Sequence, residues 1–419
     1  SPTIAAVQPA RERLMRARTH AERFPRPYWI LLTGEAIQSI GYGMIVPFIS
    51  IYLTDTIGVS ATGAGAILAA LGVVGVVSQP LGGILADRIG RRPMIIAGLA
   101  AAAVSVIGFG LVSSAWAVLL LGMIWGAGYG VFEPAAGALV ADVSTEELRT
   151  EAFGLWRVVN NAGFTLGPPL AALVIWLSSL RGTYLVAGAT LLAYLAIAWR
   201  LLPETRPTKH ADEPPARFRE ALADRLLLVL IIGSLMAALV YGIFEAALPV
   251  FLHDDRGLSV ATWGLVFGIN PLLITIFQYP ISRWAAKRSS RAVLAGGSLL
   301  LGAGIALVAP FPGIPVLIVA VVLFTFGEML EFPVASAVAA DLAPERLRGS
   351  YQGALNVAFE GAWIPASLGG LWLIGTGQGE LLLALALPLG AVGALLFFAL
   401  PRGRVSRRPP ILRAEPPGP

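Results

Sequence analysis

Long apolar segments are the feature that most constrains how this chain of 419 residues can fold. A helix needs about 20 apolar residues to cross the hydrocarbon core of a bilayer. Only 13% of the residues are charged, about half the share of an average soluble protein. We therefore expect an all-α integral membrane protein. Twelve segments are long and apolar enough to span a membrane, at residues 28–53, 63–86, 93–113, 116–141, 152–178, 182–202, 226–252, 260–284, 292–310, 314–340, 351–375 and 380–400.

The polar stretches divide these segments into two groups of six. A charged, proline-rich linker is predicted over 203–225, between a six-helix half at 28–202 and a second six-helix half at 226–400. Residues 1–27 and 401–419 are predicted to be polar tails.

The two halves share an internal repeat. A single shift of 199 residues aligns Tyr42 with Tyr241, Asp55 with Asp254, Gln79 with Gln278, Pro134 with Pro333 and Gly154 with Gly353. Two parallel six-helix repeats of this kind are typical of one large class of secondary transporters. We expect two pseudo-symmetric halves.

The distribution of charge predicts the orientation in the membrane. All but three of the 30 Lys and Arg residues lie in the tails, in the linker or in connections on one side of the predicted bundle. The exceptions are Arg157, Arg181 and Arg256. Under the positive-inside rule, both termini are cytoplasmic, and we expect a multi-pass protein of the cell inner (plasma) membrane.

Several kinds of site are not expected. The chain has no cysteine, and its three histidines lie in polar stretches outside the apolar segments, so no His/Cys metal site is predicted. The basic residues occupy short connections rather than a groove, which argues against nucleic-acid binding. We expect neither an enzyme active site nor a cofactor.

The connection between the second and third spans carries a specific motif, GGILADRIGRRPM at 82–94. It resembles motif A of the major facilitator superfamily, and the resemblance covers about residues 28–400. The matching residues are Gly83, Asp87, Arg88, Gly90, Arg91 and Arg92. The resemblance implies that Asp87 engages the neighbouring half and latches the outward-open state. The second copy, at 282–291, has Ala286 in place of the aspartate, so we expect only the first copy to act as a full latch.

The fifth span carries a second motif, formed by Gly154, Gly163, Gly167 and Pro168. Its spacing resembles motif C, which in this superfamily marks proton-coupled exporters. A glycine-rich surface for close helix packing is the alternative interpretation.

The first span adds a third resemblance. Glu35 lies twelve residues before Pro47, a spacing similar to that of the acid and proline in bacterial multidrug/proton antiporters. The fourth span departs from that branch, because Gly122 stands where drug exporters usually have an arginine. Arg157 is the candidate to replace it.

Seven charged residues lie away from the ends of the predicted spans, where each costs roughly 2.5–3.5 kcal/mol on insertion scales. They are Glu35, Glu133, Arg157, Glu245, Glu328, Glu331 and Glu360. Residues of this kind are candidate functional sites, and we take all seven as candidates for proton coupling. For Glu133 and Arg157, which are expected at similar depth on consecutive helices, a structural ion pair is the alternative.

In the superfamily, the first, fourth, seventh and tenth spans line a central cavity. The resemblance, the helical spacing and the repeat together give eight candidates for a substrate cavity: Gln38, Tyr42, Trp125, Tyr129, Phe132, Asn161, Tyr241 and Phe244. Plain packing is the alternative for each aromatic residue.

These observations lead to one main hypothesis. We expect a monomeric secondary active transporter that works by alternating access and exports lipophilic, often cationic, small molecules in exchange for protons. Its partners are then the substrate, protons and the lipid bilayer, and the proton gradient supplies the energy. The alternatives are an exporter or flippase of a lipid or lipid precursor, and a proton-coupled uptake symporter for a sugar or metabolite.

Overall fold

The computed structural model describes residues 24–145, 148–205, 221–310, 313–344 and 348–400. The side chains of residues 87, 149–151 and 348–350 are outside this description. Most of the predicted linker and almost all of both predicted tails also lie outside the described residues.

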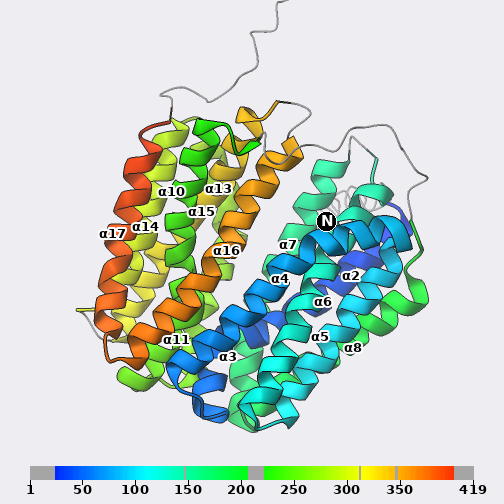
Figure 1. Ribbon diagram of the computed structural model, residues 1–419, viewed down its shortest axis with the longest axis horizontal. Helices are drawn as coiled ribbons and strands as arrows, with labels where there is room; N and C mark the ends of the chain where they lie inside the picture. The colour runs from blue at the N-terminus through cyan, green and yellow to red at the C-terminus, as the bar shows by residue number, and fades with distance from the viewer. Residues whose placement is uncertain (1–23, 146–147, 206–220, 311–312, 345–347, 401–419) are drawn as a thin grey trace, which may run out of the picture.

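The described chain is a helical bundle (Figure 1), as the sequence predicted, and it contains a helix at each predicted span. Eleven spans are long and apolar enough to cross a membrane, and the ninth predicted span corresponds to a shorter apolar helix. The uninterrupted helices are α4 (Ala61–Ile89), α5 (Arg91–Leu111), α6 (Ala115–Val143), α7 (Arg149–Leu177), α8 (Leu180–Leu201), α14 (Ser290–Ala306), α15 (Ile314–Leu342), α16 (Arg348–Gly375) and α17 (Gly379–Phe397).

The first, seventh and eighth spans are broken helices. The first comprises α2 (Arg26–Ile45), η1 (Val46–Phe48), α3 (Ile49–Ile51) and η2 (Tyr52–Thr56). The seventh comprises α10 (Arg225–Gly242), η3 (Ile243–Ala247), α11 (Leu248–Val250) and η4 (Phe251–Asp255), and the eighth comprises α12 (Val260–Phe267) and α13 (Ile269–Ala285). Pro47 and Pro249 explain the first two breaks, because proline has no N–H to donate and its ring crowds the preceding turn.

The helices pack as two sets. In the set α2–α8, called the first half below, α2 packs against α7 and α8, and α6 packs between α4 and α5. In the set α10–α17, called the second half, α10 packs against α16 and α17, and α14 packs against α15 and α17. Figure 1 shows the two sets side by side, in contact through α4 with α16, and α7 with α12 and α13.

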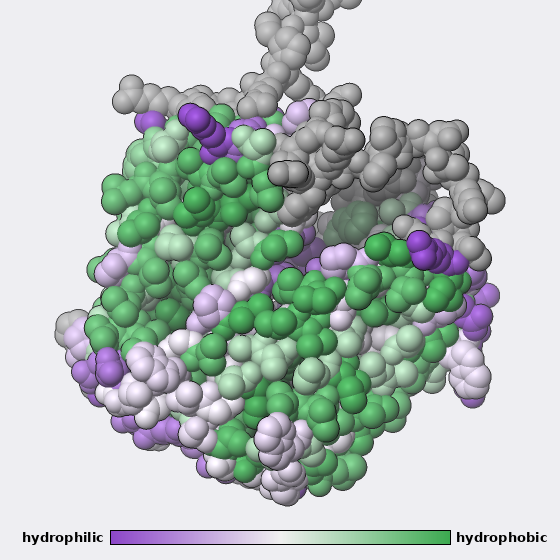
Figure 2. All heavy atoms as spheres, viewed as in Figure 1, coloured by the Kyte–Doolittle hydropathy of each residue, from purple (hydrophilic) through white to green (hydrophobic). Residues whose placement is uncertain are grey.

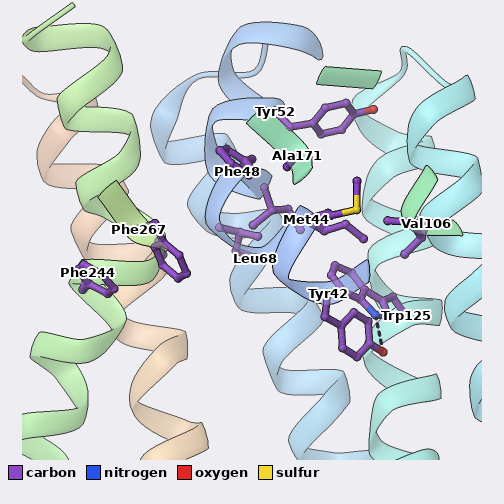
Figure 3. Packing of buried hydrophobic residues seen from close by; sticks show 14 of the residues in the cluster. Tyr42, Met44, Phe48, Tyr52, Leu68, Val106, Trp125, Ala171, Phe244 and Phe267 are labelled. Carbon is purple, nitrogen blue, oxygen red and sulfur yellow. Dashed lines mark hydrogen bonds between the residues drawn. The ribbon is translucent and has the colours of Figure 1, made fainter. Parts of the chain in front are cut away.

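The two halves meet on the side away from the chain ends. The indole N–H of Trp263 donates a hydrogen bond of 2.8 Å to the carbonyl of Pro47, across the interface. Phe48 of the first half packs against Gly264 of α12, and it belongs to the same buried apolar cluster as Phe244 and Phe267 of the second half (Figure 3). Toward the side where α2 begins and α17 ends, called the termini side below, the two sets diverge (Figure 1). The surface is hollowed between them near that side (Figure 2).

Candidate functional site

A cavity of about 590 Å³ lies between the two halves. Residues of α2, α4, α6 and α7 line it from the first half, and residues of α10, η3, α15 and α16 line it from the second. The predicted cavity residues among its lining are Gln38, Tyr42, Trp125, Tyr129 and Tyr241. The cavity is therefore built by both halves.

The cavity gathers most of the predicted membrane-embedded acids. Glu35 and Glu133 enter from the first half, and Glu245, Glu328 and Glu360 enter from the second. Arg157 is the one predicted membrane-embedded base, and it lines the same cavity. The site therefore holds more carboxylates than its basic residue can neutralise.

In the first half, the carboxylates accept hydrogen bonds from uncharged groups. The side-chain amide of Asn160 donates to Glu35 Oε1 at 2.8 Å, and the Ser39 hydroxyl donates to the same oxygen at 3.1 Å. The hydroxyl of Tyr129 donates to Glu133 Oε1 at 3.4 Å. These bonds orient the carboxylates without supplying a compensating positive charge.

The second half uses the same arrangement. The amide of Asn270 donates to Glu328 Oε2 at 2.8 Å and to the Thr325 hydroxyl at 3.0 Å. A side pocket of about 140 Å³ opens beside this pair, between α7 and α13. Asn161, predicted for the cavity, lines this side pocket.

The structural ion pair considered for Glu133 and Arg157 is not formed among the described residues. The hydrogen bond that Glu133 accepts comes from Tyr129 instead. Arg157 lines the cavity together with Glu328 of the other half. Both Glu133 and Arg157 line the cavity, so similar depth on consecutive helices brought the two side chains to the same cavity without pairing them.

Three further candidates lie outside both pockets: Phe132 and Phe244, whose expected placement in the cavity is corrected, and Glu331, which was a candidate for proton coupling. Phe132 packs edge-on against Tyr194 of α8, and Phe244 stacks on Phe324 of α15. Glu331 is fully buried between α10 and α15, where its Oε1 accepts a 2.7 Å hydrogen bond from Ser234. Its helix neighbour Glu328 faces the cavity, so residues three apart on α15 have different surroundings.

Aromatic rings alternate with the acids around the cavity. Trp125 donates from its indole N–H to the Tyr42 hydroxyl at 3.3 Å, which holds the two rings against each other (Figure 3). On the opposite wall, Tyr241 stacks on Phe324 and contacts Phe332. Such rings offer apolar contact and electron-rich faces to a cation.

Sequence reasoning missed several polar and aromatic residues of the lining. Four of them are Gln79, Asn356, Phe359 and Trp363. The last three lie on one face of α16 with Glu360, at helical spacing. Extending the helical face from Glu360 would have found them.

The motif A region forms a network at the termini side. Gly90 has φ +124° at the end of α4, and its amide bonds to the Ala86 carbonyl. Arg91 pairs with Asp142 through Nε at 3.1 Å, and its backbone N–H donates to Glu204 Oε1 at 2.8 Å. The motif thus ties α5 to the ends of α6 and α8.

Fewer contacts are described for the other residues of motif A. Gly83 lies in α4, and Arg88 is exposed near the end of that helix. Arg92 donates to the Trp199 carbonyl. The side chain of Asp87 lies outside the described residues, so its role as a latch stays a prediction.

The motif C glycines mark a close helix contact. A Cβ on Gly167 would lie 2.5 Å from the backbone of Gly43 on α2, and a Cβ on Gly163 would collide with Ser39. Pro168 follows inside α7. Gly154, in contrast, has open space around its position. The packing interpretation therefore applies to two of the three glycines.

Two helical halves around a central polar cavity, together with the internal sequence repeat, are typical of secondary transporters built from parallel repeats. The family model of the Major Facilitator Superfamily matches residues 31–367 and 230–417. The chain belongs to this superfamily of transporters.

Relatives and solved structures agree with this assignment. The chain is 28% identical to multidrug resistance protein MdtH of Salmonella typhimurium (strain LT2), over 93% of this chain and 96% of the relative. It is 26% identical to the uncharacterized MFS-type transporter YqjV of Bacillus subtilis (strain 168), over 84% and 87%.

A POT family transporter solved with 5-aminolevulinic acid has a TM-score of 0.76 at 16% identity, over 90% of this chain and 96% of that one. The nucleoside transporter NupG also has a TM-score of 0.76 at 16% identity, over 89% and 99%. At this identity these structures support the fold.

Proposed function

We propose that the protein exports lipophilic, often cationic, small molecules in exchange for protons, by alternating access. The observation that carries this proposal is the composition of one cavity: five carboxylates, one arginine and a wall of aromatic rings. A carboxylate withdrawn from water is costly in its charged form. Binding either a proton or a cation removes that cost, so the two compete for the same groups.

The open side of the cavity and the charge pattern support loading of substrate from the cytoplasm. The basic residues concentrate on the termini side, which favours a cytoplasmic location for that side in an inner membrane. The contact between Trp263 and Pro47 closes the opposite side. In this conformation the cavity would load substrate from the cytoplasm. The names of the MdtH relatives also support efflux as the function of this chain.

The test uses purified protein in liposomes with an acidic lumen and tetraphenylphosphonium, a lipophilic cation, outside. We expect the cation to accumulate inside while protons leave, and accumulation to stop when an ionophore collapses the gradient. No cation movement in vesicles that hold their gradient would contradict the proposal. If the gradient drives transport of a dipeptide or a nucleoside instead, the proposed substrate class is wrong.

A further inference from the structure

Four basic residues cluster where α13 ends and α14 begins: Arg283, Lys287, Arg288 and Arg291. The first three are exposed. Within the part of the chain that the structure describes, none of the four forms an ion pair. Uncompensated positive charge beside a bilayer attracts anionic headgroups.

Three of these guanidinium groups lie over aromatic rings. Arg288 lies 5.0 Å from the Trp284 ring centre, and Arg283 lies 5.8 Å from that of Tyr279. Arg291 lies 5.5 Å from the ring of Phe398 at the end of α17. Tyr279 is 71% exposed and Trp284 is 49% exposed, so both rings lie on the outer surface of the bundle. Tyrosine and tryptophan in such positions are typical of the interface between lipid chains and headgroups.

The internal repeat shows which way this surface faces. The shift of 199 residues aligns Arg283 with Ile84 and Arg288 with Ile89. Both isoleucines are exposed on α4, in a membrane protein whose outer surface contacts lipid. The two arginines therefore occupy positions at which the first half exposes apolar side chains.

In the first-half copy of this connection, two of the three basic residues make contacts within the protein. Arg91 pairs with Asp142 and also donates to the Ala86 carbonyl at 2.8 Å. Arg92 donates to the carbonyl of Trp199. The two copies of the same connection thus differ. Arg91 and Arg92 of the first copy make internal contacts, whereas Arg283 and Arg288 of the second copy are exposed.

We propose that Arg283, Arg288 and Arg291 form a binding site for the phosphate headgroup of an anionic phospholipid. A guanidinium stacked on a ring keeps its planar donors available for phosphate oxygens. The exposed rings of Tyr279 and Trp284 supply the surface for the acyl chains. Because the site carries net positive charge, it prefers an anionic lipid to a zwitterionic one.

The test measures retained lipid by native mass spectrometry of the full chain in detergent, with phosphatidylglycerol and phosphatidylcholine added in equal amounts. We expect a preference for phosphatidylglycerol of about tenfold, which corresponds to about 1.4 kcal/mol of binding free energy. The triple variant Arg283→Gln/Arg288→Gln/Arg291→Gln loses this preference. The charge-matched control Arg26→Gln/Arg200→Gln/Arg225→Gln, on the same side of the bundle, keeps it within about twofold.

Several outcomes would overturn the proposal. They are equal retention of the two lipids by the unchanged protein, full preference in the triple variant, and loss of preference in the control. Inorganic phosphate at millimolar concentration is expected not to displace the lipid, and displacement would contradict a lipid site. If the triple variant is not recovered folded, Arg288→Gln alone must lower the preference. None of these measurements depends on transport.

Discussion

Glu328 and Glu331 are both glutamates of α15, but their side chains lie in different surroundings. Glu328 lines the cavity and accepts from Asn270, whereas Glu331 is buried behind it and accepts from Ser234. The sequence identified both as membrane-embedded acids but could not separate them. Their spacing of three residues places both on the same side of α15. Which neighbours each side chain contacts depends on how α10 and α13 pack against that helix.

This difference provides a matched pair of variants. We expect Glu328→Gln to weaken binding of tetraphenylphosphonium by about tenfold or more, since a hydrogen bond or contact to a charged group contributes about 1.5–3 kcal/mol. Glu331→Gln is expected to change binding less than about twofold, because Glu331 does not reach the cavity. Isothermal titration of the purified variants measures both. Equal losses would show that the cavity does not define the cation site.

At the scale of elements, the contact between α2 and α7 depends on glycine. Gly167 lies against the backbone of Gly43, and Gly163 lies against Ser39. The sequence predicted a glycine-rich surface on this helix, but it could not show that Gly154 stands outside the contact. Which residues of a periodic pattern touch a neighbour depends on the crossing point of the two helices.

We expect Gly167→Ala to destabilise the protein by about 1–3 kcal/mol, because the added methyl group overpacks the contact. Gly154→Ala is the control on the same helix, and it is expected to leave stability unchanged or raise it by up to about 1 kcal/mol. Unfolding in denaturant, followed by tryptophan fluorescence, compares the two. A Gly167→Ala variant as stable as the control would show that α2 and α7 are not in close contact.

Broken helices were the main feature of the fold that the apolar pattern did not reveal. The spans 28–53 and 226–252 look continuous by hydropathy, yet each contains π turns and a proline in the structure. Hydropathy indicates which segments lie in lipid, but it does not indicate the pattern of backbone hydrogen bonds inside a span. Pro47 and Pro249 were the available signal.

At the scale of the whole molecule, the sequence predicted the twelve spans and the family, while the state of the cavity needed the structure. Whether the cavity opens on one side depends on the angle between the two halves. No single sequence motif specifies that angle.

Alternating access predicts that the two ends of the α4–α16 contact move in opposite directions. The chain has no cysteine, so spin labels can be placed without a background. When the outward-open state is populated, we expect the distance between labels at Val77→Cys and Val357→Cys to shorten. The distance between labels at Thr62→Cys and Thr376→Cys is expected to lengthen. Electron–electron resonance spectroscopy measures both, and a parallel change would contradict rocking of one half against the other.

The central claim is that protons and a lipophilic cation compete for the carboxylates of one cavity. Proton release on cation binding tests it most directly, in weakly buffered detergent solution with a pH-sensitive dye. We predict that adding tetraphenylphosphonium to the purified protein releases protons, that the release falls as the starting pH rises and the carboxylates ionise, and that Glu328→Gln releases fewer. Cation binding without proton release at any pH would contradict the claim.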